Sequence, residues 1–221
     1  MEKLVKVAGI ALPMLQANID TDQIIPVPEM TRSSEETHER WGAGLFAYWR
    51  YLGDREPNPA FILNQEPWKR AVILLADRNF GCGSSREPAP KALRGYGFRA
   101  VIAPSFAGIF YGNSFRNGLL PVELPIDQVR ELARQMEVAK GQAEVTVDLE
   151  KEEVIAPDGQ MYKFRTPAPL RRMLLNGLDE IDQTLQSIDA IAAFQRRDAA
   201  RRPWVYAPGL ADNYDSKGVA T

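Results

Sequence analysis

The stretch AVILLADRNFGCGSSREPAPKALRGYGFRAVIAPSFAGIFYGNSFRNGLLPVELP, residues 71–125, decides the fold. Its short apolar runs are rich in β-branched residues, which is typical of strands buried on both faces. Strands are predicted at 71–76, 99–104 and 119–125. Helices are predicted between them at 87–97 and 105–118, the first with Pro near its start and Gly at its end. This alternation predicts an α/β fold with a mostly parallel layer.

The rest of the chain predicts one domain over residues 1–199. Rough alternation of apolar residues predicts a first strand at 4–12, and a meander of antiparallel strands is predicted from AEVTVDLE to APDGQMYKF. Three further helices are predicted at 126–140, 167–178 and 179–199. Residues 27–70 are longer than a normal connection, as functional loops often are. Residues 200–221 lack periodicity and predict an extended or disordered tail.

Composition excludes several classes of protein. The chain has 221 residues with 45% hydrophobic and 25% charged residues, which is ordinary for a globular protein. Its net charge of −2 gives no strong attraction to nucleic acid or to an anionic membrane. No apolar run is long enough to span a membrane, and no signal peptide is recognisable. We therefore expect a cytoplasmic protein with neither membrane nor nucleic-acid partners.

Two residue counts limit the chemistry. Cys82 is the only cysteine, so this chain alone cannot form a disulfide or hold an iron–sulfur cluster through several thiolates. Its position in a glycine-rich turn favours a small residue that fits over a nucleophile. His38 is the only histidine, so the usual proton shuttle at neutral pH is nearly absent. We expect no metal ligand in this chain.

The glycine-rich turn NFGCGSSRE, residues 79–87, follows a buried strand and precedes a helix. Gly81 and Gly83 allow the backbone to approach a ligand closely, and Ser84 or Ser85 can cap the helix. Arg86 offers a fork that matches a carboxylate. These features predict an anion site beyond the carboxyl end of a strand. A capped helix with a surface arginine is the alternative, and the spacing alone leaves both open.

Two long motifs carry a family resemblance. ILLADRNFGCGSSRE at 73–87 and GYGFRAVIAPSFAGIFYGNSFRNGLLPVEL at 95–124 resemble the small subunit of 3-isopropylmalate dehydratase, a family similar to the swivelling fourth domain of aconitase. NIDTDQIIP at 18–26 and MLLNGLDEIDQTLQ at 173–186 also match. The resemblance implies a three-layer β/β/α swivelling domain. It further implies that residues 27–70 form a substrate-recognition loop.

The resemblance implies a hydro-lyase of two subunits. A separate large subunit would carry a [4Fe–4S] cluster, and the pair would form a heterodimer that moves the hydroxyl group of isopropylmalate in leucine biosynthesis. This chain would then bind no cofactor, would need its partner for activity, and would take a small dicarboxylate as substrate.

The same resemblance assigns roles to residues of this chain. Ser84 would be the catalytic base that removes the proton next to a carboxylate. Ser85, Arg86 and Arg32 would bind the substrate, with Arg32 reading its distal part. Asp20 and Asp22, like Gly81 and Gly83, would shape the site. For the two aspartates, a turn in which the side chain bonds nearby backbone amides is at least as plausible a role.

Two departures from the family pattern leave the substrate open. The family usually has histidine after the S-S-R-E motif, and here Pro88 replaces it. A charged stretch, SSEETHERW at 33–41, is inserted in the recognition loop. Either change could alter substrate choice. A related hydro-lyase acting on citraconate, dimethylmalate or a methylcitrate-type acid is therefore an alternative, as is a non-catalytic anion-binding protein.

Overall fold

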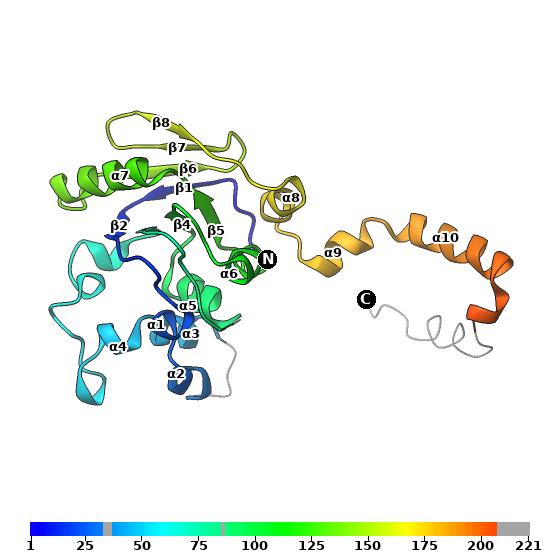
Figure 1. Ribbon diagram of the computed structural model, residues 1–221, viewed down its shortest axis with the longest axis horizontal. Coiled ribbons are helices and arrows are strands. Elements are labelled where there is room, and N and C mark those ends of the chain that lie inside the picture. The colour runs from blue at the N-terminus through cyan, green and yellow to red at the C-terminus, as the bar shows by residue number, and fades with distance from the viewer. Residues whose placement is uncertain (33–36, 85–86, 207–221) are drawn as a thin grey trace. The chain divides into compact units, whose positions relative to one another are not determined.

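The computed structural model describes residues 1–32, 37–84 and 87–206. Within these ranges the chain divides into two units, Met1–Asp179 and a second unit that begins at Glu180. The first unit is built on two four-stranded sheets (Figure 1). The domain predicted over residues 1–199 includes the first unit and the beginning of the second.

The parallel sheet has the strand order β2-β3-β4-β5. Its strands are β2 (Ala11–Met14), β3 (Ile73–Ala76), β4 (Ala100–Ala103) and β5 (Leu120–Glu123). All three pairings are parallel, with Ile73 opposite Ala11 and Ala100 opposite Ile73. The last three strands lie where the apolar runs predicted them. Because all four strands are parallel, their carboxyl ends lie along one edge of the sheet, together with the loops that follow them.

The second sheet is antiparallel, with the order β1-β6-β7-β8. It consists of β1 (Lys6–Gly9), β6 (Val145–Asp148), β7 (Glu153–Ile155) and β8 (Met161–Lys163). The meander predicted from the sequence is thus present. The single strand predicted at 4–12 is wrong, because the chain leaves one sheet after Gly9 and enters the other at Ala11.

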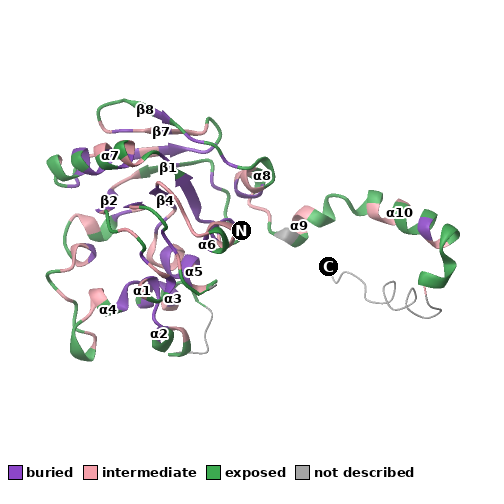
Figure 2. Ribbon diagram, viewed as in Figure 1, coloured by how far each residue is buried: buried purple, intermediate pink, exposed green. Residues whose placement is uncertain are grey.

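Alternate side chains of the parallel strands enter two separate cores. Ile73 and Leu75 face the antiparallel sheet and α7 (Ile126–Val138). Leu74 and Ala76 face the layer of helices on the other side. Side chains that alternate between two buried faces explain why these strands read as continuous apolar runs (Figure 2). The predicted β/β/α layering is therefore observed.

The helical layer beside the parallel sheet is formed by helices from the first part of the chain. They are α1 (Thr21–Ile24), α2 (Val27–Thr31), α3 (His38–Gly44), α4 (Ala47–Arg50), α5 (Pro88–Tyr96) and α6 (Gly108–Arg116). The described parts of segment 27–70 therefore contain helices and three short 3-10 turns, at Gly53–Arg55, Ile62–Asn64 and Trp68–Arg70. The first unit ends with α8 (Ala168–Asn176), which Gly177 terminates in a left-handed conformation.

The second unit, as far as residue 206, contains two α-helices where the sequence predicted a single one. They are α9 (Glu180–Leu185) and α10 (Ile188–Arg201), followed by a 3-10 turn at Pro203–Val205. Asp198 accepts hydrogen bonds from the Arg202 guanidinium and the Tyr206 hydroxyl, which ties the turn to α10. Most of the predicted tail, residues 207–221, lies outside the described residues.

Candidate active site

The glycine-rich turn after β3 has a backbone that other residues cannot adopt easily. Gly81 and Gly83 have φ values of +76° and +92°. A Cβ atom on Gly81 would lie 2.2 Å from the ring of Phe110, which α6 places directly against the turn. Because the φ angle and the ring both exclude a side chain at Gly81, the turn packs tightly on the start of α6.

The segment before α1 pairs with this turn. Gly81 N–H donates to the Ile19 carbonyl at 2.8 Å, Thr21 N–H donates to the Cys82 carbonyl at 2.9 Å, and Asp20 lies opposite Cys82. Asp20 also begins α1 with a capping box: its carboxylate accepts from Gln23 N–H at 2.7 Å, and the Gln23 side chain accepts from Asp20 N–H at 2.9 Å. Asp20 therefore shapes the loop through local hydrogen bonds, which is the alternative that the sequence left open for it.

Asp22 follows in the first turn of α1 and is exposed. An acidic residue there is favourable because the start of a helix carries partial positive charge.

Thr21 makes a contact that sequence reasoning missed. Its side-chain hydroxyl donates to the backbone carbonyl of Ser84 at 2.9 Å, and the residue is 2% exposed. Its backbone N–H also donates to the Cys82 carbonyl, so Thr21 is hydrogen-bonded to the turn at two points. The sequence does show a threonine between Asp20 and Asp22 in the motif NIDTDQIIP. The prediction for this motif named only the two aspartates.

Ser84 is exposed and lines a small hollow of about 110 Å³. The other walls come from Thr21, the two glycines of the turn and the first residues of α6: Gly81, Gly83, Ala107, Gly108, Ile109 and Phe110. No side chain among the described residues caps α6, and the first amides of any helix lack partners within it. The positive end of a helix therefore lies beside Ser84, and this helix is α6.

The start of α5 differs from the prediction. Its N-cap is Glu87, which makes no capping hydrogen bond. Of the two predicted caps, Ser84 or Ser85, Ser84 therefore does not hold the cap position. Pro88 occupies the first helical position, where its missing N–H costs no helical hydrogen bond. Ser85 and Arg86 lie outside the described residues, and their predicted roles remain predictions.

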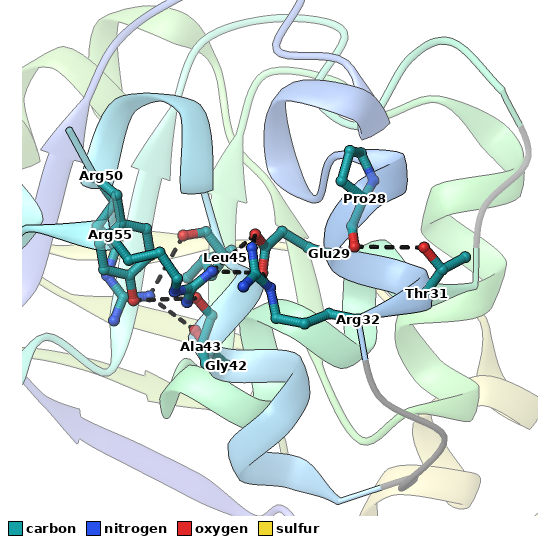
Figure 3. A network of polar contacts seen from close by, with 10 residues as sticks. Pro28, Glu29, Thr31, Arg32, Gly42, Ala43, Leu45, Arg50 and Arg55 are labelled. Atoms are coloured by element: carbon teal, nitrogen blue, oxygen red, sulfur yellow. Dashed lines mark hydrogen bonds and ion pairs between the residues drawn. The ribbon is translucent and has the colours of Figure 1, made fainter. Parts of the chain in front are cut away.

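Arg32 is placed in a second, larger hollow of about 540 Å³. It follows α2 and donates to the Glu29 carboxylate through Nε at 3.1 Å and Nη2 at 2.8 Å (Figure 3). The structure thus groups Gly81, Gly83 and Ser84 around one hollow, and Asp20 pairs with the turn at Cys82. Arg32 lines another hollow, which it shares with Arg55. The segment from Thr21 to Pro26 connects the two, since Thr21 lines the first and Pro26 the second.

Comparison with known proteins assigns the chain to a family. The family model "Aconitase C-terminal domain" matches residues 1–127, and the model for the C-terminal domain of the 3-isopropylmalate dehydratase small subunit matches residues 180–207. The 3-isopropylmalate dehydratase small subunit of Cupriavidus necator is 49% identical over 211 residues, which cover 95% of this chain and all of that protein. This chain belongs to the 3-isopropylmalate dehydratase small-subunit family.

Two further relatives agree. The small subunit from Albidiferax ferrireducens is 46% identical, covering 93% of this chain and 97% of that protein. The crystal structure of 3-isopropylmalate dehydratase (LeuD) from Methanocaldococcus jannaschii has a TM-score of 0.61 and 29% identity, covering 86% of this chain and 99% of that one. The resemblance and the swivelling α/β fold inferred from the motifs are both confirmed.

The described residues of this small subunit do not fit an iron–sulfur cluster. No three His, Cys, Asp or Glu side chains among residues 1–32, 37–84 and 87–206 are grouped so that they could hold a metal ion. The one thiol, Cys82, lies beside the Asn18 carbonyl oxygen at 3.5 Å. Burial, and then the negative charge of Asp20, raise the pKa of this thiol above its ordinary value. A raised pKa disfavours the thiolate, the form that binds metal.

None of the helices in the described part of the chain has both the length and the apolar character required to cross a bilayer.

Proposed function

We propose that this chain is the small subunit of a hydro-lyase that converts 2-isopropylmalate into 3-isopropylmalate, by dehydration and rehydration, in leucine biosynthesis. Membership of the small-subunit family over nearly the whole chain carries this proposal. The position of Ser84 supports it, because this serine lines a hollow between a glycine turn and the start of α6.

Ser84 acts as the base in this proposal. Its Oγ takes the proton from the carbon next to a substrate carboxylate, and in the rehydration half it returns a proton to the neighbouring carbon. A serine alkoxide needs fixed positive charge around it. The uncapped start of α6 supplies part of that charge, and the guanidinium of Arg86 would add more. Ser85, Arg86 and Arg32 bind the carboxylates, while Asp20, Asp22, Gly81 and Gly83 keep the loop in shape.

The partner in this proposal is a large subunit that carries a [4Fe–4S] cluster and forms a heterodimer with this chain in the cytoplasm. Removal of the substrate hydroxyl needs a Lewis acid, and the described residues of this chain offer no group that could hold one. The small subunit alone is therefore expected to be inactive, and its substrate is a small dicarboxylate.

A related diacid is the second candidate substrate. Pro88 stands at the first position of α5, where the family usually has a histidine, and proline supplies neither a donor nor a charge. Citraconate, dimethylmalate or a methylcitrate-type acid would then replace isopropylmalate in the same reaction. A non-catalytic anion-binding role is the third candidate.

Co-expression with a cluster-bearing large subunit under anaerobic conditions tests the three candidates. The complex is assayed with 2-isopropylmalate and with citraconate, and each subunit is assayed alone. Turnover of 2-isopropylmalate only by the complex is the expected result. Turnover of citraconate alone would favour the second candidate, and no turnover of any diacid by an intact complex would favour the third.

A further inference from the structure

Glu29 is a carboxylate buried beneath two arginines at the edge of the larger hollow. It lies in α2, its side chain is 8% exposed, and it accepts hydrogen bonds from both Arg32 and Arg55 (Figure 3). Arg55 comes from the 3-10 turn Gly53–Arg55, far along the chain from α2. The motifs that identified the family single out neither Glu29 nor Arg55.

The geometry of Arg55 is fixed from three sides. Its Nη1 donates to both carboxylate oxygens of Glu29 at 2.8 Å and 2.7 Å, and its Nη2 donates to the Ala43 carbonyl at 3.0 Å. The guanidinium also lies over the ring of Tyr51, 4.3 Å from its centre. A guanidinium held in this way loses little further freedom when it binds an anion.

The charges around Glu29 do not balance. Glu29 faces two guanidinium groups, so these three side chains together keep one positive charge, and the carboxylate of Asp54 lines the same hollow. The side chains of Arg32 and Arg55 are 52% and 30% exposed, so solvent or a ligand reaches them. Arg32 Nη1 donates to no group among the described residues. A carboxylate could therefore bind there without displacing the bonds to Glu29.

The rest of the hollow is lined by the carboxylate of Asp54 and by apolar and aromatic residues. Pro26, Pro28, Ala47 and Leu52 line it together with the rings of two tyrosines. Its volume of about 540 Å³ is within the ~300–1,000 Å³ that is usual for small-molecule sites. Two guanidinium groups beside apolar side chains suit a diacid with a hydrocarbon branch.

We propose that Arg55 is a substrate-binding residue that receives, with Arg32, the carboxylate more distant from Ser84, and that Glu29 is the positioning residue that holds both guanidinium groups. This inference rests on the proposed function, since it concerns the substrate of the same enzyme. The path from Thr21, beside Ser84, to Pro26, at this hollow, is one turn of helix and two further residues, on the order of 10 Å.

The competing explanation is that Glu29 and Arg55 merely join α2 to the turn at Gly53–Arg55. The two explanations differ in the effect of Glu29→Gln on substrate affinity. This substitution removes a negative charge, so simple attraction of an anion would lower KM. If Glu29 positions the arginines, KM rises in spite of the added positive charge.

The experiment uses the complex of both subunits and measures kcat and KM for the diacid that the wild-type complex turns over. For Arg55→Met we expect KM to rise about 10- to 100-fold, the effect of losing a charged hydrogen bond, with kcat changed less than about threefold. Arg55→Lys should recover part of this loss, and Glu29→Gln should raise KM about tenfold. Arg70→Met, which removes an exposed partner of Glu66, is the matched control and should leave KM unchanged.

An unchanged KM in Arg55→Met, in a complex that assembles normally, would overturn the proposal. A lower KM in Glu29→Gln would overturn the positioning role. If Glu29→Gln prevents assembly, the two Arg55 variants still decide the question. A wild-type complex that turns over no diacid would contradict the proposed function instead, so the two failures are distinguishable.

Discussion

The side-chain hydroxyl of Thr21 donates a hydrogen bond of 2.9 Å to the backbone carbonyl of Ser84. This bond joins the segment that begins α1 to the turn that follows β3. It acts on the backbone of Ser84, so it fixes where the residue lies and leaves its own hydroxyl free to react. A buried contact that holds the backbone of the proposed base should affect the rate more than the affinity.

Thr21→Val tests this relationship, because valine has nearly the same shape and lacks the hydroxyl. We expect kcat of the two-subunit enzyme to fall about 10- to 100-fold with little change in KM, because a small displacement of the base is costly. The loss of one buried hydrogen bond should also lower the free energy of unfolding by about 1 kcal/mol.

Thr21→Ser is the matched control for this variant. It keeps the hydroxyl and should restore most of kcat, although it removes a methyl group from the buried site. Equal losses of kcat in the Val and Ser variants would mean that packing, and not the hydrogen bond, matters at position 21.

Ser84→Ala tests the proposed base directly. We expect turnover to be lost by more than about 10³-fold while the two subunits still associate, since the residue is exposed and its side chain makes no hydrogen bond among the described residues. Steady-state assays and size-exclusion chromatography of the complex measure the two effects.

Ser187→Ala is the control for Ser84→Ala, because Ser187 is an exposed serine outside the first unit that caps no helix with its side chain. It should retain full activity. Undiminished turnover in Ser84→Ala would refute the role of Ser84 as base.

Gly81→Ala and Gly83→Ala distinguish two reasons why the turn needs glycine, namely the positive φ angle and the lack of space for a side chain. Both residues have positive φ, which costs alanine about 1–2 kcal/mol. At Gly81 the new methyl group would also meet the Phe110 ring, and such overpacking costs a further ~1–3 kcal/mol. At Gly83 the nearest atom, Asp20 Cβ, is 3.4 Å from the position that a new Cβ would take, which leaves enough room.

We therefore expect Gly81→Ala to lower the free energy of unfolding by about 2–5 kcal/mol and Gly83→Ala by only about 1–2 kcal/mol. Urea denaturation of the purified chain measures both values. Phe110→Leu should relieve part of the cost at Gly81, and equal losses in the two glycine variants would contradict the role of the ring.

The parallel sheet was predictable because its signal is local. Leu74 and Leu75 point into different cores, so a strand buried on both faces has apolar residues at every position. The glycine turn after it was predictable for a similar reason, because backbone angles at Gly81 and Gly83 require that residue type. In both cases a few neighbouring residues determine the structure.

The break between β1 and β2 was not predictable in this way. Val7 pairs with Val147 in one sheet, and Leu12 pairs with Leu74 in the other. The two partners are far away in the sequence, and the apolar residues of the segment continue across the break. Only the packing of the complete domain assigns the two strands to different sheets.

The Glu29 cluster was missed for the same physical reason. Residues 27–70 carry many charges of both signs, and nothing in their order selects Arg55 as the partner of Glu29. Which charged side chains form a buried ion pair depends on which residues the complete fold brings together. Arg32 was found only through the family motif, and its bond to Glu29 was not foreseen.

Cys82 offers a test of the electrostatics at the turn. Burial and the charge of Asp20 raise the pKa of its thiol, so less thiolate exists at pH 8 than for an ordinary cysteine. Alkylation of the purified chain by iodoacetamide should therefore be slow at pH 8 compared with glutathione, and should become faster as the pH rises toward the raised pKa.

Asp20→Asn removes the negative charge and keeps a residue that caps helices well. The pKa of the thiol should fall toward its ordinary value, and alkylation at pH 8 should become faster, by up to about tenfold for a shift of one unit. Asp22→Asn is the matched control, because the Asp22 charge does not contribute to the raised pKa of Cys82. A rate that Asp20→Asn leaves unchanged, or that Asp22→Asn raises equally, would show that the Asp20 carboxylate does not act on this turn. If Asp20→Asn alone speeds the reaction, the aspartate that begins α1 is electrostatically coupled to the loop that holds Ser84.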